Sequence, residues 1–314
     1  MTARADTATV PATTAEGMLG LAWKRFRHHK IALVSAVVLI VLATASAAAP
    51  LIELALGTDA NLVNLYLRFA GPSLAHPLGT DELGRDVLVR LLYGGRVSLL
   101  VGLTAALASA VLGTMIGLLA GYYGGRLDAF LMRTTDAVIA LPLLALLIVL
   151  AAIDLRKLGL SEAMIDSENI SLYRIIVIVA LTGWTTVARL VRGRALTVRE
   201  RDYVLAAHSQ GAGGLRIMLV HILPNVVSPI IVAATLSIGN VILLESVLSF
   251  FGLGIQPPIA SWGNLLTNAQ ELIWQAPALV IYPGLMIFMT VISFNFLGDG
   301  LQDALDPQAM DRAD

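Results

Sequence analysis

Residues 201–211 read Arg201-Asp-Tyr-Val-Leu-Ala-Ala-His-Ser-Gln-Gly211, and residues 221–225 read His221-Ile-Leu-Pro-Asn225. This stretch is polar, rich in arginine and helical in its pattern, and it lies between two long apolar runs. In a helix, Tyr203, Ala206 and Ala207 would lie within two turns on neighbouring faces. Because small alanine side chains let a helix approach another surface closely, the sequence predicts a short helix that packs against a partner surface.

The glycines and the proline that follow predict a hinge. Gly211 suits the positive φ that commonly ends a helix, and Gly213 and Gly214 extend the bend. A second helix is expected to begin near Leu215. Pro224 marks the entry to the next apolar run, where its missing N–H costs least. A short helix on a glycine hinge, tied to a long apolar helix, suits the mechanical coupling of two parts of an assembly.

The composition indicates an integral membrane protein. Of the 314 residues, 57% are apolar and 14% are charged, whereas a soluble domain averages about a quarter charged residues. The charge deficit comes from long uncharged runs, which favours a membrane protein. The net charge of −1 argues against nucleic acid as a partner. The absence of cysteine excludes disulfides and thiolate metal sites.

Six stretches are expected to cross the bilayer, each crossing needing about 20 mostly apolar residues. They are residues 31–49, 97–123, 137–153, 175–188, 226–244 and 272–297. The third is short and contains Pro142, and the fourth is bounded by Arg174 and Arg189. In the second, four small residues are expected to form a face for close helix packing: Gly102, Gly113, Gly117 and Gly121.

Basic residues predict the orientation in the membrane, because short cytoplasmic loops carry an excess of lysine and arginine. They gather before the first span and between the fourth and fifth, so both termini are expected in the cytoplasm. The expected organisation is a cytoplasmic tail (1–30), a first transmembrane helix (31–53), an extracytoplasmic loop (54–96), a core membrane domain (97–298) containing a cytoplasmic coupling loop (189–225), and a C-terminal cytoplasmic tail (299–314).

Motifs for catalysis are missing from the sequence. A usual ATP site needs a glycine-rich loop that ends in Gly-Lys-Ser/Thr. The only lysines are Lys24, Lys30 and Lys157, and none stands in that context. The five histidines lack zinc-ligand spacing, and no alternating strand–helix pattern surrounds the Gly-x-Gly pairs. The chain is therefore expected not to be an enzyme and to hold no metal or cofactor.

Residues 201–225 resemble the EAA loop of the membrane subunits of ABC importers. That pattern is Glu-Ala-Ala, three residues, Gly, nine residues, Ile-x-Leu-Pro. The chain matches it at Ala206, Ala207, Gly211, Leu223 and Pro224. The chain departs from it at Leu205 and His221, in a way similar to the dipeptide/oligopeptide permease family. In that family the loop forms a short cytoplasmic helix that docks into a cleft on the ATPase.

Four further segments extend the resemblance over roughly residues 18 to 308, and they occur in the order of the C-type subunit of that family. They are His76-Pro-Leu-Gly-Thr-Asp-Glu-Leu-Gly-Arg-Asp86, Tyr122-Tyr-Gly-Gly-Arg-Leu-Asp128, Glu245-Ser-Val-Leu-Ser-Phe-Phe-Gly-Leu-Gly-Ile-Gln-Pro-Pro258 and Gly298-Asp-Gly-Leu-Gln-Asp-Ala-Leu-Asp-Pro307.

The resemblance implies an all-α polytopic fold, the six-span transmembrane domain of a type I ABC importer in a bacterial inner membrane. It implies a B-type permease subunit as a heterodimer partner, one or two ATP-binding subunits that hold ATP and Mg²⁺, and an extracytoplasmic solute-binding protein. The implied solute is a short peptide. Nickel or another small solute stays an alternative, because related permeases share these motifs.

Five residues near the expected outer surface each allow a structural and a functional interpretation. Asp81, Arg85 and Asp86 form either a solvated, self-paired turn and helix start or a contact with the binding protein or a gate. Trp262, after a loop that Pro257 and Pro258 keep from being helical, suits a membrane interface or a seal at the outer mouth. Glu245, at the outer end of the fifth span, is either hydrated or in contact with solute or gate.

Two rival classes remain open. An ion-coupled secondary transporter would need ionisable residues in mid-span, and the spans carry almost none. A membrane-embedded hydrolase would need a zinc motif or a pair of mid-span aspartates, and neither is present.

Overall fold

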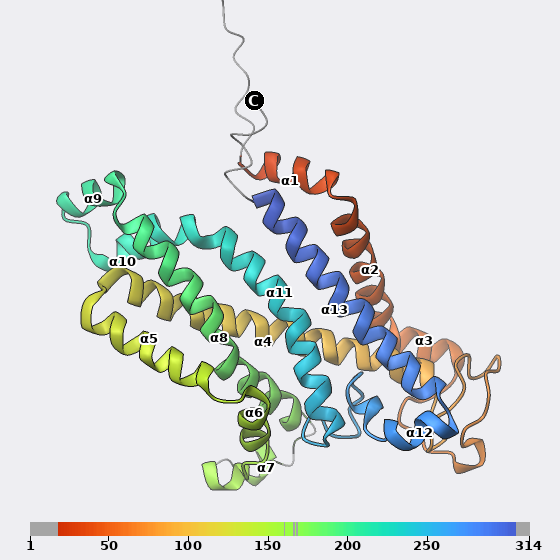
Figure 1. Cartoon of the computed structure of the whole chain (residues 1–314). Helices are drawn as coiled ribbons and strands as arrows, with labels where there is room; N and C mark the ends of the chain where they lie inside the picture. Colours follow the sequence, from red (N-terminus) through yellow and green to blue (C-terminus); the bar gives the residue numbers. More distant parts are fainter. Residues whose placement is uncertain (1–17, 160, 166, 168, 306–314) are drawn as a thin grey trace, which may run out of the picture.

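The chain folds into helices joined by turns and loops. The computed structural model describes residues 18–159, 161–165, 167 and 169–305 (Figure 1). Within these residues there is no β-strand, only an isolated bridge between Thr80 and Asp86, so the predicted all-α class is confirmed. The α-helices are α1 (Met18–His28), α2 (Lys30–Ala47), α3 (Ala49–Leu56), α4 (Val87–Tyr123), α5 (Gly125–Ala140), α6 (Leu143–Ala151), α7 (Glu162–Ile165), α8 (Ile170–Arg199), α9 (Asp202–Ser209), α10 (Gly214–Arg216), α11 (Leu223–Phe250), α12 (Ala269–Gln275) and α13 (Ala278–Leu305).

The described residues contain five helical stretches that are long and apolar enough to cross a membrane. They are Lys30–Ala47, Val87–Tyr123, Ile170–Arg199, Gly214–Phe250 and Ala278–Leu305. A sixth span arises if the bent pair α5 and α6 counts as one. The predicted number of six spans is therefore reached if this bent pair is counted as the third span.

The third span was predicted as one continuous stretch over 137–153, and this is wrong. The chain bends by 87° between α5 and α6. Leu141 is extended, with φ −76° and ψ 139°, and Pro142 follows it. A proline clashes with a helical conformation of the preceding residue and has no N–H for a helical hydrogen bond, so the helix ends there.

Other boundaries also differ from the prediction. Helix α4 begins at Val87, inside the expected outer loop 54–96. Of the expected N-terminal tail, residues 18–28 form α1 and residues 1–17 lie outside the described residues. The expected tail 299–314 begins as the end of α13, and residues 306–314 lie outside the described residues. The sixth span is interrupted before Pro277, where Ala276 leaves the helical region at φ −146°.

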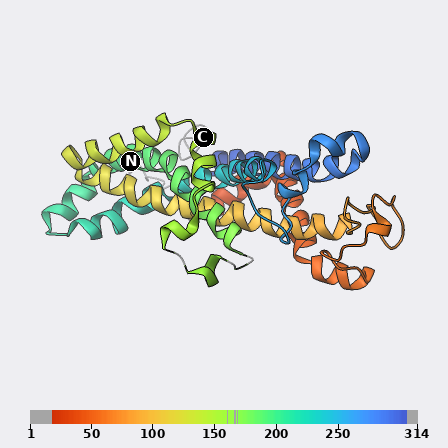
Figure 2. The same ribbon diagram turned by 90° about the horizontal axis from the view of Figure 1, so that it is seen from below.

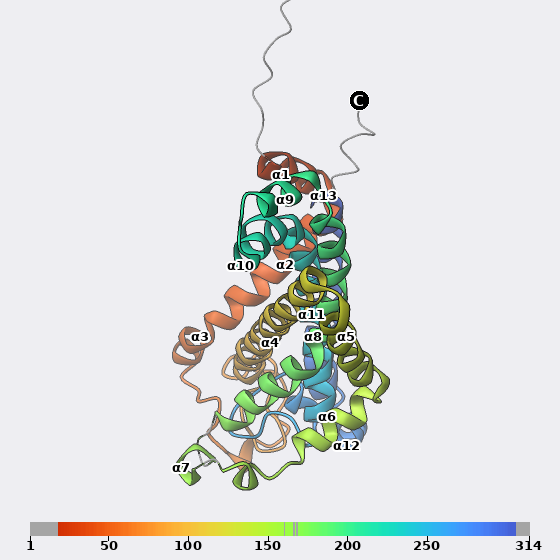
Figure 3. The same cartoon turned by 90° about the vertical axis from the view of Figure 1, so that its left-hand side faces the viewer.

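The helices divide the molecule into two ends. Helices α1, α9 and α10 and the C-terminal end of α13 lie at one end, and α7 and α12 lie at the other (Figures 1 and 3). Seen from below, the helices form a flattened layer rather than a round bundle (Figure 2). We call the end with α9 the inner end and the end with α12 the outer end.

Close packing of α4 on α8 depends on glycine, as predicted. A Cβ at Gly117 would lie 2.6 Å from the carbonyl oxygen of Ala188, and Gly113 and Gly121 approach α8 as closely. Gly102 faces α11 in the same way, where a Cβ would lie 2.8 Å from a side-chain carbon of Ile242. These distances leave no room for a side chain, so the two contacts fix the position of α4.

Replacing Gly117 with leucine is expected to destabilise the subunit by on the order of 3 kcal/mol, because the added side chain must push α4 away from α8. Gly193→Leu on α8 is the matched control, since nothing lies within 4 Å of a Cβ at Gly193. The thermal unfolding midpoint of the detergent-purified protein measures the effect. Equal midpoints for the two variants would contradict the packing argument.

Candidate functional site

Helix α9 stands as a separate short helix at the inner end, beyond the end of α8. Arg201 is extended, with φ −74° and ψ 143°, so the chain leaves α8 and starts a new helix at Asp202. The carboxylate of Asp202 lies in the first turn, where the helix dipole favours negative charge.

Gly211 closes α9, as predicted. Its φ is +83°, in the region that L-residues other than glycine rarely adopt. The Gly211 N–H donates to the carbonyl of His208 at 2.9 Å, and the Ala212 N–H donates to the carbonyl of Ala207 at 3.1 Å. This pair of bonds is the Schellman motif, which satisfies carbonyls at the end of a helix and turns the chain sharply.

Val204 anchors α9 to the rest of the protein. It is the buried residue of α9, and it belongs to an apolar cluster with Ile217, Ile222 and Val226. By contrast, Tyr203 is 47% exposed, Ala206 is exposed and Ala207 is half-buried. Helix α9 is therefore held by one face and leaves its other faces free.

The connection from α9 to α11 is helical but irregular. After α10 the chain forms a π-helix, Ile217–Ile222, and continues without a break into α11. The N–H of Leu223 donates to the carbonyl of Met218, five residues back. Pro224 follows, and the side-chain amide of Asn225 donates to the carbonyl of His221 at 2.7 Å. Short π-segments frequently occur at functional sites, and this one joins α9 directly to a membrane span.

The inner half of α8 forms a fixed platform beside α9. The predicted coupling loop begins at residue 189, and the structure shows that its first part is helical, since Arg189 and Arg192 lie within α8. Arg192 makes two hydrogen bonds to the carboxylate of Asp128 on α5, at 2.5 and 2.6 Å. Arg199 donates to the carbonyl of Tyr122 at the end of α4, at 3.0 Å. Arginines predicted for a solvated loop thus tie α8 to its neighbours.

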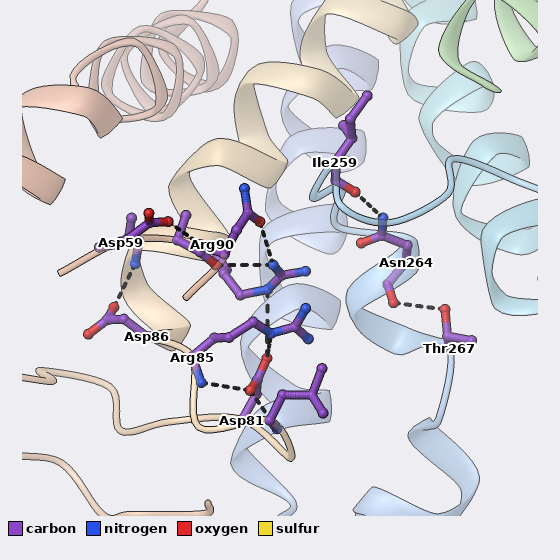
Figure 4. A network of polar contacts seen from close by, with 12 residues as sticks. Asp59, Asp81, Arg85, Asp86, Arg90, Ile259, Asn264 and Thr267 are labelled. Carbon is purple, nitrogen blue, oxygen red and sulfur yellow. Dashed lines mark hydrogen bonds and ion pairs between the residues drawn. The ribbon is translucent and has the colours of Figure 1, made fainter. Parts of the chain in front are cut away.

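At the outer end, the predicted self-paired turn is present but buried rather than solvated. Asp81 and Asp86 are 6% and 1% exposed. Asp81 accepts a hydrogen bond from Nε of Arg85 at 2.7 Å (Figure 4). Asp86 caps α4 by accepting from the N–H of Val89 at 2.8 Å, and it lies 2.9 Å from Nδ1 of His76. The helix start is confirmed, and these carboxylates hold the turn together.

Glu245 is fully buried, so the expectation of a hydrated carboxylate at the membrane surface is wrong. Its Oε1 accepts hydrogen bonds from the hydroxyls of Ser249 at 2.7 Å and Ser261 at 2.8 Å. Its Oε2 accepts from Ser98 on α4 at 3.4 Å. We call these four residues the Glu245 network.

The Glu245 network also holds the loop between α11 and α12. Each of its serine hydroxyls accepts a hydrogen bond from a backbone N–H of that loop. The distances are 3.3 Å from Ile255 to Ser249, 3.1 Å from Trp262 to Ser98 and 3.0 Å from Asn264 to Ser261. One carboxylate thus organises three points of the loop through hydroxyl groups.

Trp262 lies inside the protein, which corrects its expected place at the membrane interface. It is 1% exposed, and its indole N–H donates to the carbonyl of Leu91 on α4 at 2.9 Å. Gly94 and Gly95 make room for the ring, since a Cβ at Gly95 would lie 2.9 Å from it. The loop that was expected at the surface is therefore fastened to α4 as well as to α11.

Several apolar helices that are long enough to cross a membrane place the chain among polytopic membrane proteins. Within the described ranges, no group of three or more His, Cys, Asp or Glu side chains is placed to hold a metal ion.

Comparison with known proteins gives the family. Residues 113–310 match the family of binding-protein-dependent transport system inner membrane components, and residues 17–65 match the N-terminal transmembrane domain of oligopeptide transport permease C. The chain belongs to the first of these families. It is a membrane-spanning permease subunit of the ABC transporter type.

Individual relatives are similar over most of their length. The dipeptide transport system permease protein of Alkalihalophilus pseudofirmus is 38% identical, over 91% of this chain and 89% of that protein. The oligopeptide transport system permease protein of Bacillus subtilis is 35% identical, over 91% and 90%. The glutathione transport system permease protein of Pectobacterium atrosepticum is 40% identical, over 91% and 90%.

Proposed function

We propose that this subunit forms half of the translocation pathway of an ATP-driven importer for short peptides. The relatives above are named for dipeptides, oligopeptides and glutathione, which are all peptides, and their similarity spans most of this chain. The flattened shape of the subunit supports a half-pathway, because such a layer needs a second subunit to enclose a path (Figure 2). That second subunit is a B-type permease.

The observation that carries the proposal is α9, a short helix that is anchored by Val204 and exposed on its other faces. We assign to it the docking of a partner ATPase, which holds ATP and Mg²⁺. Tyr203, Ala206 and Ala207 are the contact residues, and Gly211 sets the direction in which α9 leaves its hinge. Movement of α9 passes through the π-segment into α11.

The pathway opens alternately to the two sides in this proposal. ATP binding brings the ATPase subunits together, and the linked movement of α11 opens the outer end to a loaded solute-binding protein. Hydrolysis resets the assembly. ATP drives the cycle because it binds one state of the partner chains better than the other.

The inner end faces the cytoplasm of a bacterial cell in this arrangement, and both termini lie on that side. Its support is the concentration of arginine in α8 and the segment that follows, which the positive-inside rule assigns to the cytoplasm. The outer end then meets the binding protein. Asp86, Glu245 and Trp262 have almost no exposed surface, so they shape that end rather than touch a partner directly.

Site-specific crosslinking tests the assignment of α9. The chain has no cysteine, so His208→Cys places a single thiol on the exposed surface of α9. A cysteine-directed photocrosslinker at this position is expected to capture a co-expressed ATPase subunit, in a yield that changes with ATP. Gln302→Cys, at the same end on α13, is the control and is expected to give at most a trace. If His208→Cys gives no ATPase adduct, α9 is not the docking helix.

A further inference from the structure

The outer end contains a cavity that the proposed pathway does not yet use. Its volume is about 340 Å³, which lies at the lower end of the range of small-ligand pockets. One wall comes from the turn and helix start at residues 81–91, and the other comes from the loop and helices at residues 249–283. Because the Glu245 network orders that loop, the cavity has a preformed wall.

The first wall carries two arginines that share one aspartate. Nε of Arg85 donates to Asp81 at 2.7 Å, and Nε of Arg90 lies 3.7 Å from the same carboxylate oxygen. The other oxygen of Asp81 accepts from the backbone N–H groups of Leu83 and Arg85, at 2.9 Å each. Asp81 is therefore fully engaged within the turn.

Each of the two arginines has N–H donors that no described residue accepts a hydrogen bond from. Arg90 is 3% exposed and lines the cavity, and its buried Nε has no hydrogen-bond partner. The terminal nitrogens of Arg85 donate no hydrogen bond to any residue that the structure describes. Both side chains extend toward the side of the view on which Asn264 and Thr267 lie (Figure 4). The planar fork of Arg85 is thus available for a carboxylate, which a guanidinium binds with two parallel hydrogen bonds.

A free acidic group lies in the same wall. Glu82 lines the cavity, and its carboxylate accepts no hydrogen bond within the described part of the chain. The charged lining residues are two arginines, Arg85 and Arg90, and two acids, Asp81 and Glu82, so the lining is neutral overall. Because Asp81 is shared by the two arginines, Arg85 and Arg90 together keep one surplus positive charge, and Glu82 adds one negative charge. These two charges match a ligand that carries one charge of each sign.

The remaining lining is mostly apolar, with amide side chains and the hydroxyl residues Ser249 and Thr267. Leu265, Leu272 and Leu279 supply apolar surface, while Asn264 and Asn268 supply amide groups from the opposite wall. Such a combination, mostly apolar with a few placed polar groups, is common in small-molecule sites. It fits the side chains and the peptide bond of a very short peptide.

We propose that this cavity binds a free dipeptide, with its C-terminal carboxylate at Arg85 and its N-terminal ammonium at Glu82. The proposal rests on the proposed peptide-import function and adds a peptide site on the permease itself, at the outer mouth. Because both contacts are made by the charged ends of the peptide, the site is expected to select for unblocked ends.

Binding to the whole importer complex tests the proposal. The complex in lipid nanodiscs, without its solute-binding protein, is titrated with radiolabelled alanyl-leucine. Saturable binding is expected, and Arg85→Gln is expected to weaken it at least tenfold. C-terminally amidated alanyl-leucine is expected to bind wild type at least tenfold more weakly, with no further loss in Arg85→Gln, because both changes remove the same contact.

Two tryptophan variants test the cavity without changing Arg85 or Arg90. Asn268 is exposed, lines the cavity and makes no side-chain hydrogen bond, so Asn268→Trp narrows the cavity without disturbing the turn. Gln270→Trp is the matched control, because Gln270 is exposed in the first turn of α12 and lies outside the lining. Asn268→Trp is expected to abolish binding, and Gln270→Trp is expected to retain it.

Two different failures are distinguishable. If wild type shows no saturable binding, or if Arg85→Gln and Asn268→Trp bind like wild type, the cavity is not a peptide site. If peptide uptake with the binding protein present is still ATP-driven in that case, the proposed function survives without it. If wild type imports no peptide at all, the proposed function fails first.

Discussion

Replacing Gly211 with valine is expected to abolish ATP-driven uptake and to lower transport-coupled ATP hydrolysis by more than tenfold. Gly211 has a φ of +83°, and a β-branched residue there is strained by roughly 1–2 kcal/mol or more. Nothing lies within 4 Å of a Cβ at this position, so the effect comes from the backbone and not from a clash. We expect the relaxed turn to point α9 away from the docking direction proposed for it.

Gly211→Asn is the matched control for this result, because asparagine tolerates the left-handed region far better than valine does. It is expected to keep most of the coupled hydrolysis. Both variants must insert in the membrane in equal amounts, since the glycine is exposed and at the surface. If Gly211→Val couples as well as Gly211→Asn, the turn does not set the position of α9.

Replacing Glu245 with leucine is expected to give the second large effect, a destabilisation of about 3 kcal/mol or more together with loss of uptake. Removing the carboxylate leaves three serine hydroxyls without their shared acceptor in a fully buried place. Those hydroxyls also hold the N–H groups of Ile255, Trp262 and Asn264, so the whole loop is expected to loosen. Thermal unfolding of the purified complex and hydrogen exchange of residues 251–264 measure it.

Glu245→Gln removes the negative charge of the side chain but keeps an oxygen that accepts hydrogen bonds. Its side-chain oxygen still accepts from Ser249 and Ser261, so most of the loop order should remain. Protection of the loop amides close to that of wild type is the expected outcome. A loop that exchanges equally fast in Glu245→Gln and Glu245→Leu would show that the hydrogen bonds do not organise it.

The helical membrane fold could be predicted because uncharged runs and glycine spacing report directly on spans and on their packing. The bend between α5 and α6 was not predicted, although Pro142 signals it. A proline inside a span is compatible with a straight, kinked or broken helix, and tertiary packing decides among them. The length of α8 was missed because its arginines resemble a solvated loop until their partners, Asp128 and Asp136, are known.

The inner candidate site was predicted in part. The glycine that ends α9 has a local cause and could be placed from the sequence, and the φ of +83° at Gly211 confirms it. Val204 was not singled out, although it is the residue that anchors α9, because its burial depends on the distant residues Ile217 and Val226. A lone β-branched residue in a polar helix is the signal that could have identified it.

The outer residues were placed wrongly for a common physical reason. Asp86, Glu245 and Trp262 belong to types that are usual at surfaces or membrane interfaces, and their burial depends on partners far away in the sequence. Ser98 lies 147 residues from Glu245, and Leu91 lies 171 residues from Trp262. No local pattern reports such pairs.

The most direct measurement is uptake of radiolabelled alanyl-leucine into proteoliposomes that contain this subunit with its co-encoded partners and binding protein. We predict uptake that requires ATP at the face carrying α9, requires the binding protein at the opposite face, and persists when ion gradients are abolished. Uptake that runs on an ion gradient without ATP would contradict it and would favour a secondary transporter.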